Sequence, residues 1–242
     1  GAMGWHSLLH QKRIPFDSFE ARELNHRVFK YIKQEAVKES NTMGFERGEA
    51  PDMQGTGRRN AHLLAIAPNA NSSIICGTSP SIEPAKANAY THRTRAGSHL
   101  VKNKYLEQEL KKVKQNTQDV WSSIITNGGS VQHLDFLSQK VKDVFKTAIE
   151  LDQLVLVEQG ADRQEYLCQG QSLNLFFPAG ADKKDLHRAH FAAWKLGTKG
   201  LYYLRTETSQ RAENVSLKVA RDALKDFETQ AMTQDECVAC QG

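Results

Sequence analysis

Apolar residues recur at helical spacing in several parts of this chain. A capping box that begins at Asp17 precedes apolar positions that predict a helix over about 17–38. Residues 134–151 place leucine, valine, phenylalanine and alanine on one face and predict a long amphipathic helix. Asp182 has the character of an N-cap, and Gly197 ends the helix that it predicts.

Shorter apolar runs predict strands. Residues 61–67 form an apolar run between turn signals and predict a buried strand. The segment before it, 42–59, is rich in glycine and charge and predicts a loop. Residues 200–204 predict a strand that carries Tyr202 and Tyr203. Side chains alternate between the two faces of a strand, so these two rings point to opposite faces unless the backbone is distorted.

Composition narrows the class of protein. The 242 residues are 39% hydrophobic and 25% charged, which excludes a disordered polymer and a disulfide miniprotein. The net charge of +4 gives no strong reason to expect nucleic acid as a partner. The apolar runs are far shorter than the roughly 18–20 residues that span a bilayer. The absence of a signal-like start and the small number of cysteines lead us to expect a cytoplasmic protein without a membrane partner.

Small polar residues follow the predicted strand at 61–67. Backbone N–H groups and hydroxyls at the start of a helix there would favour an anion such as phosphate. Asparagine and serine also cap helices that bind nothing, so a simple capped turn is the alternative. The residues concerned are Pro68, Asn69, Ala70, Asn71 and Ser72.

Two further pairs of residues have candidate chemistry. Cys237 and Cys240 have the Cys-x-x-Cys spacing near the end of a polar segment, which fits a redox pair on a tether or half of a zinc site. Tyr202 and Tyr203 fit ordinary core packing as well as function. Cys76 has no predicted role beyond packing.

Several stretches together resemble one enzyme family. GRRNAHLLAIAPNANSSIICGTSPSIEP resembles the substrate-phosphate strand and loop of the large, catalytic subunit of class I ribonucleotide reductase. HFAAWKLGTKGLYYLRT is similar to the last barrel strand of that family, and the terminal Cys-x-x-Cys is similar to its shuttle thiols. YTHRTRAGSHLVKNKYLE and DRQEYLCQGQSLNLFF also fit, and the stretches occur in the family's order.

The resemblance implies a fold and roles for the candidate residues. It implies an α/β chain in which 1–206 form the C-terminal half of a ten-stranded barrel and 207–242 form a flexible tail. Residues 68–72 would hold the phosphates of a ribonucleoside diphosphate, and helix 183–196 would receive the tail of a radical-generating small subunit. Tyr202 and Tyr203 would relay an electron and a proton between that subunit and the substrate. The shuttle thiols, reduced by thioredoxin or glutaredoxin, would be Cys237 and Cys240.

The resemblance also implies what the chain needs from elsewhere. The family's catalytic cysteines and nucleotide-effector sites lie in the N-terminal part of the subunit, and no segment here matches them. We therefore expect the C-terminal part of a reductase large subunit, either naturally split or separated from its N-terminal part, inactive alone and tightly bound to an N-terminal half. It would hold no metal or cofactor of its own and would depend on the di-iron-type radical centre of the small subunit. Its product would be deoxyribonucleotides for DNA synthesis. The alternative is a non-catalytic docking module for the small subunit or the other half.

Overall fold

The computed structural model describes residues 2–94 and 97–206 of the chain, which fall into two compact units. Residues 2–85 and 148–206 form the first unit, and residues 86–147 form the second. Each unit has a hydrophobic core of its own. All the site residues discussed below that the structure describes belong to the first unit.

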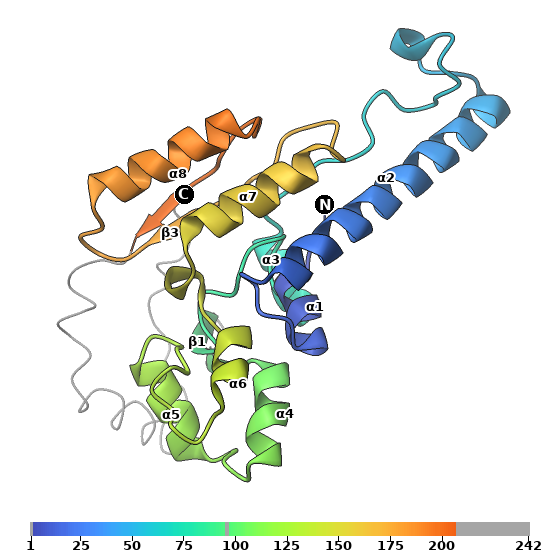
Figure 1. Ribbon diagram of the computed structural model, residues 1–242. Coiled ribbons are helices and arrows are strands. Elements are labelled where there is room, and N and C mark those ends of the chain that lie inside the picture. The colour runs from blue at the N-terminus through green and yellow to red at the C-terminus, as the bar shows by residue number, and fades with distance from the viewer. Residues whose placement is uncertain (1, 95–96, 207–242) are drawn as a thin grey trace. The chain divides into compact units, whose positions relative to one another are not determined.

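The first unit is mostly helical, with short parallel strands (Figure 1). Helix α7 contacts both α2 and α8, so it is the central helix of this unit. Its elements are α1 (Trp5–Lys12), α2 (Phe19–Arg47), η1 (Pro51–Met53), α3 (Ala70–Ile75), η2 (Ala148–Glu150), α7 (Gln153–Gln164), β3 (Leu175–Phe177), α8 (Lys183–Lys195) and β4 (Leu204–Thr206).

Helix α2 is longer than the sequence predicts. Ser18 is its N-cap and accepts a hydrogen bond from the Ala21 N–H at 3.2 Å, and the helix continues to Arg47. The predicted loop from residue 42 is therefore wrong at its start. Gly44 lies within the helix, and a Cβ at this position would meet the carbonyl oxygen of Gly57. This glycine permits a close backbone approach and does not break the helix.

Parallel pairing in the first unit joins segments that are distant in sequence. Strands β3 and β4 pair with Leu175 opposite Leu204, and Ile66 forms an isolated parallel bridge with Gln171. The predicted strand at 61–67 is reduced to that bridge. The sulfur of Cys168 accepts hydrogen bonds from the N–H groups of Leu63 and Leu64. These N–H groups therefore do not pair with a neighbouring strand, and parallel pairing begins only at Ile66.

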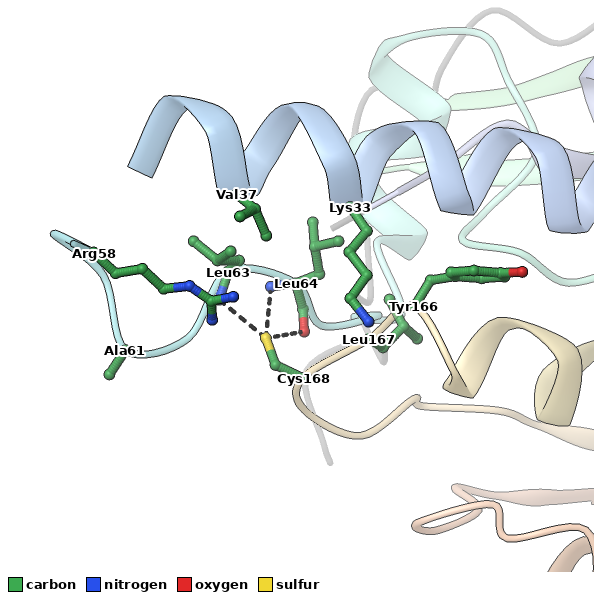
Figure 2. A pocket seen from close by; sticks show the side chains of 9 residues that line it. All are labelled: Lys33, Val37, Arg58, Ala61, Leu63, Leu64, Tyr166, Leu167 and Cys168. Carbon is green, nitrogen blue, oxygen red and sulfur yellow. Dashed lines mark hydrogen bonds between the residues drawn. The ribbon is translucent and has the colours of Figure 1, made fainter. Parts of the chain in front are cut away.

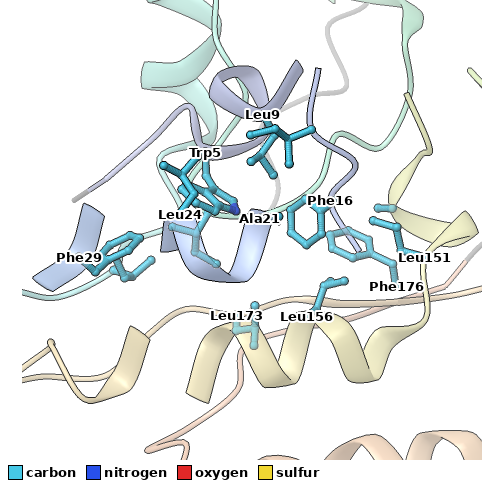
Figure 3. Packing of buried hydrophobic residues seen from close by; sticks show 14 of the residues in the cluster. Trp5, Leu9, Phe16, Ala21, Leu24, Phe29, Leu151, Leu156, Leu173 and Phe176 are labelled. Carbon is cyan, nitrogen blue, oxygen red and sulfur yellow. The ribbon is translucent and has the colours of Figure 1, made fainter. Parts of the chain in front are cut away.

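The core of the first unit lies between α1, α2 and α7 (Figure 3). Its apolar members include Trp5, Phe16 and Leu156, all buried. Polar groups are buried beside them: the Gln159 amide accepts the Trp5 indole N–H at 3.2 Å and donates to the Phe16 carbonyl at 2.7 Å. Because every one of these buried polar groups has a partner, they fix how α1 and α7 pack.

The second unit contains an antiparallel hairpin and three helices. Strands β1 and β2 pair from Ala89 opposite Lys102 to Thr94 opposite Gly97. The buried Asn88 side chain donates to the carbonyls of Gly129 at 3.1 Å and Phe145 at 2.8 Å. The elements of this unit are β1 (Ala89–Thr94), β2 (Gly97–Lys102), α4 (Lys104–Lys112), α5 (Gln118–Thr126) and α6 (Gln139–Val144).

The long helix predicted over 134–151 does not form. The structure has only α6 and, after a break, the short 3-10 helix η2. The apolar positions are buried, but in two different cores: Leu134 and Phe145 pack in the second unit, and Ala148 and Leu151 in the first. The helical spacing therefore joins residues that serve separate cores.

Candidate radical-transfer and phosphate-binding site

Tyr202 and Tyr203 lie side by side immediately before β4. Their ring centroids are 4.1 Å apart with planes inclined at 50°, and the side chains are 47% and 50% exposed. The prediction of a strand from residue 200 is wrong, since β4 begins at Leu204, and the two residues are half exposed and not buried. The core-packing alternative therefore fails for this pair. Two adjacent residues of a regular strand could not bring their rings together in this way.

Electrostatics couples the two phenols to each other and to a cation. A hydrogen bond and the charge interaction with Tyr203 raise the pKa of Tyr202 above its ordinary value, and Arg205 opposes that rise. The guanidinium carbon of Arg205 lies 4.5 Å from the centre of the Tyr203 ring. A proton that leaves one phenol thus has the second phenol and a positive charge nearby.

The predicted phosphate segment forms a turn followed by a helix. Asn69 is the N-cap of α3 with a left-handed backbone (φ 53°), and its side-chain amide donates to the Ala2 carbonyl at 3.1 Å. Ala70, Asn71 and Ser72 are exposed, and Pro68 is half-buried. The Asn69 side chain does not cap the helix, which leaves the first N–H groups of α3 available to a ligand.

The phosphate segment and the tyrosines approach the same central stretch, residues 169–175. Ile66 donates its N–H to Gly170 and accepts from Ser172 on one side of it. On the other side, Tyr202 donates to Leu173 at 2.9 Å and Tyr203 accepts from Leu175 at 3.0 Å. The structure brings these two predicted groups into one region through this shared stretch and not through direct contact.

Helix α8 confirms its sequence prediction and presents aromatic residues to solvent. Asp182 caps it by accepting the Lys184 N–H at 2.9 Å, and Gly197 follows its end with a φ of 77°. On its outer face, the rings of His187 and Phe191 stack at 6.0 Å and those of Phe191 and Trp194 approach to 5.6 Å. Trp194 is 74% exposed, which is unusual for so large an apolar side chain unless a partner covers it.

A pocket that the sequence does not predict lies at a separate place in the first unit (Figure 2). It has a volume of about 230 Å³ and opens beside the thiol of Cys168. Burial alone would raise the pKa of this thiol, but the N–H groups of Leu63 and Leu64, both at 3.0 Å, contribute to lowering it. The lining residues are Lys33, Val37, Arg58, Ala61, Leu63, Leu64, Tyr166, Leu167 and Cys168.

The remaining candidate thiols, Cys237 and Cys240, lie outside the described residues, as does the zinc alternative for them. Within residues 2–94 and 97–206 no cluster of three or more histidine, cysteine or acidic side chains is placed to hold a metal ion. No helix of the described chain is long and apolar enough to cross a membrane. Cys76, for which the sequence predicts no role beyond packing, is exposed.

Comparison with known protein families decides the relationship. The family model "Ribonucleotide reductase, barrel domain" matches residues 1–56 and 51–204. The chain belongs to the ribonucleotide reductase barrel family. This confirms the predicted relationship and the α/β fold class, although the strands of the described residues do not close a barrel.

Individual relatives of this ribonucleotide reductase chain carry matching names. It is 52% identical over its whole length to the "Putative ribonucleoside-diphosphate reductase large subunit" of Frog virus 3 and covers 41% of that protein. It is 46% identical to the large subunit of Invertebrate iridescent virus 6 over 89% of its own length and 23% of that protein. The solved "Actinobacillus ureae class Id ribonucleotide reductase alpha subunit" matches 88% of the chain and 39% of that subunit, at 36% identity and a TM-score of 0.79. The chain thus spans less than half the length of these relatives.

Proposed function

We propose that this chain provides part of the active site of a ribonucleoside-diphosphate reductase large subunit, with Tyr202 and Tyr203 as its radical relay. The observation that carries the proposal is the exposed tyrosine pair with its ring centroids 4.1 Å apart. Such a pair passes one electron and one proton from one phenol to the next with little movement of heavy atoms. Half-exposed tyrosines also suit a relay that continues into a partner protein.

The substrate in this proposal is a ribonucleoside diphosphate, held by its phosphates at residues 68–72. The exposed start of α3 supports this assignment, because N–H groups without intrahelical partners favour an anion. The side-chain bond from Asn69 to Ala2 holds the turn in place. Turnover removes the 2′-hydroxyl as water and puts a hydrogen in its place.

Two electrons for that reduction come from a dithiol, which becomes a disulfide. We assign Cys237 and Cys240 to the exchange that regenerates this dithiol, with thioredoxin or glutaredoxin as the external reductant. The thiyl radical chemistry itself falls to the part of the large subunit that precedes this region in the family. The chain alone would then be inactive, and assembly with that part would complete the site in the cytoplasm.

The radical-generating small subunit is the proposed partner of α8. The exposed row of His187, Phe191 and Trp194 offers an aromatic surface of the kind that anchors a peptide segment. The di-iron-type centre of the small subunit would supply the radical, and no cofactor is assigned to this chain. The same row also favours the second candidate function, a docking module that binds the small subunit without taking part in turnover.

The test is reductase turnover of a ribonucleoside diphosphate by this chain, the small subunit and a dithiol reductant. The assay is run with and without the preceding part of the large subunit. The proposal expects deoxyribonucleotide only when all components are present. Inactivity of a complex whose assembly has been demonstrated would contradict it and favour the docking module.

A further inference from the structure

The main chain of the tyrosine pair departs from regular parallel pairing at one place. In a parallel ladder a single residue donates its N–H to one position of the neighbouring strand and accepts from the position two residues on. Here the donor to the Leu173 carbonyl is Tyr202, and the acceptor of the Leu175 N–H is Tyr203. Two residues therefore lie opposite one, Asn174, which is the geometry of a β-bulge.

The bulge explains why the rings come together. A regular strand would direct Tyr202 and Tyr203 to opposite faces, whereas an extra residue turns one of them back. Strand β4 resumes regular pairing at Leu204 opposite Leu175. Both residues are about half exposed, so the backbone sets the ring separation of 4.1 Å together with the Arg205 guanidinium, which lies over the Tyr203 ring.

A bulge leaves a backbone group without its ladder partner, and here a side chain supplies the partner. The N–H of Tyr203 donates to Oδ1 of Asn174 at 3.0 Å. The backbone N–H of Asn174 in turn donates to Oε1 of Glu83 at 3.0 Å. Asn174 and Glu83 are 6% and 4% exposed, so these bonds lie in a region where an unmade hydrogen bond is costly.

We propose that Asn174 and Glu83 are positioning residues that hold the bulge and thereby the contact between Tyr202 and Tyr203. Asn174 acts on the bulged strand directly, and Glu83 acts by fixing Asn174. Glu83 follows the phosphate segment, residues 68–72, in the chain. Through its bond to Asn174, the Glu83 carboxylate therefore links that part of the protein to the tyrosine pair. For its effect on turnover this inference rests on the proposed radical relay.

The first test is spectroscopic and needs no turnover. The chain is labelled with 3-fluorotyrosine, and the fluorine resonances of the pair are assigned with Tyr202→Phe and Tyr203→Phe. Asn174→Ala and Glu83→Ala should shift or broaden both resonances, and Glu83→Gln, which keeps an Oε1 acceptor, should restore them. Unchanged resonances in a folded Asn174→Ala chain would overturn the inference.

Gln153→Ala is the matched control for loss of a buried bond. Oε1 of Gln153 accepts the Phe176 N–H at 2.7 Å, in the same strand but away from the tyrosines. Loss of this bond should lower the free energy of unfolding and leave the two tyrosine resonances unshifted. If Gln153→Ala shifted the two tyrosine resonances as much as Asn174→Ala does, the shifts would reflect a general loosening of this segment and not a specific positioning role of Asn174.

Amide exchange in the unaltered chain keeps the inference testable if Asn174→Ala does not fold. The bond to Asn174 should slow exchange of the Tyr203 N–H by about tenfold or more relative to an unstructured peptide. Exchange at the unstructured rate would overturn the bulge assignment.

The last test is turnover in the assembled reductase. Asn174→Ala should lower kcat by about tenfold or more with a nearly unchanged KM, since small displacements of reacting groups have effects of this size. Glu83→Gln should retain most of the rate. Full activity of Tyr202→Phe and Tyr203→Phe would refute the proposed relay itself. Loss of activity in those two variants with full activity in Asn174→Ala would refute only the positioning role.

Discussion

Tyr203 lies opposite Asn174 together with Tyr202, and its N–H is bound by the Asn174 side chain at 3.0 Å. This one relationship accounts for the position of both rings. It places the two phenol rings side by side at the end of a short parallel pairing, with their centroids 4.1 Å apart. The residues that hold it are distant in sequence: Asn174 lies 29 residues from Tyr203, and Glu83 lies 91 residues from Asn174.

The first prediction concerns the ionisation of Tyr202. Its pKa is raised by the hydrogen bond and the charge interaction with Tyr203. Tyr203→Phe removes both, so the pKa of Tyr202 should fall towards the ordinary value for tyrosine. Ultraviolet titration of the phenolate band measures the pKa of Tyr202. The signal of the Tyr202→Phe, Tyr203→Phe double variant is subtracted from that of each chain to remove the other tyrosines. Tyr31→Phe, on an exposed part of α2, is the control and should leave the pKa of Tyr202 unaltered.

The second prediction concerns acid stability. Burial lowers the pKa of His10 to about 3, and its ring lies 3.8 Å from that of His6. The unfolded chain protonates this histidine near pH 6.5, so between pH 3 and 6.5 the unfolded state binds more protons. The free energy of unfolding should therefore fall as the pH falls below 6.5.

His10→Gln removes this contribution. Urea unfolding at pH 7.5 and pH 5.0 should show a loss of about 2 kcal/mol in the natural chain beyond the loss in the variant. Equal losses in the two chains would show that His10 is accessible to protons in the folded state.

The third prediction concerns the thiol at the pocket. Backbone N–H groups from Leu63 and Leu64 contribute to a lowered pKa for Cys168, and thiolates are the reactive form of cysteine. Iodoacetamide at neutral pH should therefore label Cys168 faster than Cys76, which is also exposed. Peptide mass spectrometry over a time course gives the two rates. Faster labelling of Cys76 would contradict the pKa direction.

The fourth prediction concerns the aromatic row on α8. Trp194→Ala removes a member of the row that is 74% exposed and should weaken binding of the small subunit by about tenfold or more, as loss of an aromatic anchor does. Phe45→Ala is the matched control, since Phe45 is 94% exposed at the end of α2. Calorimetric titration with the small subunit measures both. Equal affinities for the two variants would exclude α8 as the docking helix.

Local signals in the sequence predict α8 well. The predictions that fail concern features that depend on contacts between residues distant in the sequence. Asp182 and Gly197 lie directly at the two ends of α8, so their effect on the helix can be predicted without knowledge of the fold. Helix α7 also begins at a local N-cap, Asp152, but its buried face carries Gln153, Gln159 and Arg163, which interrupt the apolar pattern. The Arg163 guanidinium is satisfied by Asn25 at 2.9 Å and Gln171 at 3.2 Å, partners that only the folded chain supplies.

The same distinction applies to the site. The turn and helix at Pro68–Ser72 follow from local residue types, and the structure has a helix there. The contact between the tyrosine rings depends on a bulge held by Asn174, which no periodic pattern contains. The Cys168 pocket depends on N–H groups more than 100 residues away in the chain.

Turnover by the assembled reductase with tyrosine variants is the most direct test of the radical relay. Tyr202→Phe and Tyr203→Phe keep the ring and remove the phenolic proton, so each should lower kcat by about a hundredfold or more. Tyr31→Phe should keep the rate of the natural chain. Substantial turnover by either variant of the pair, in a complex shown to be assembled, would contradict the account.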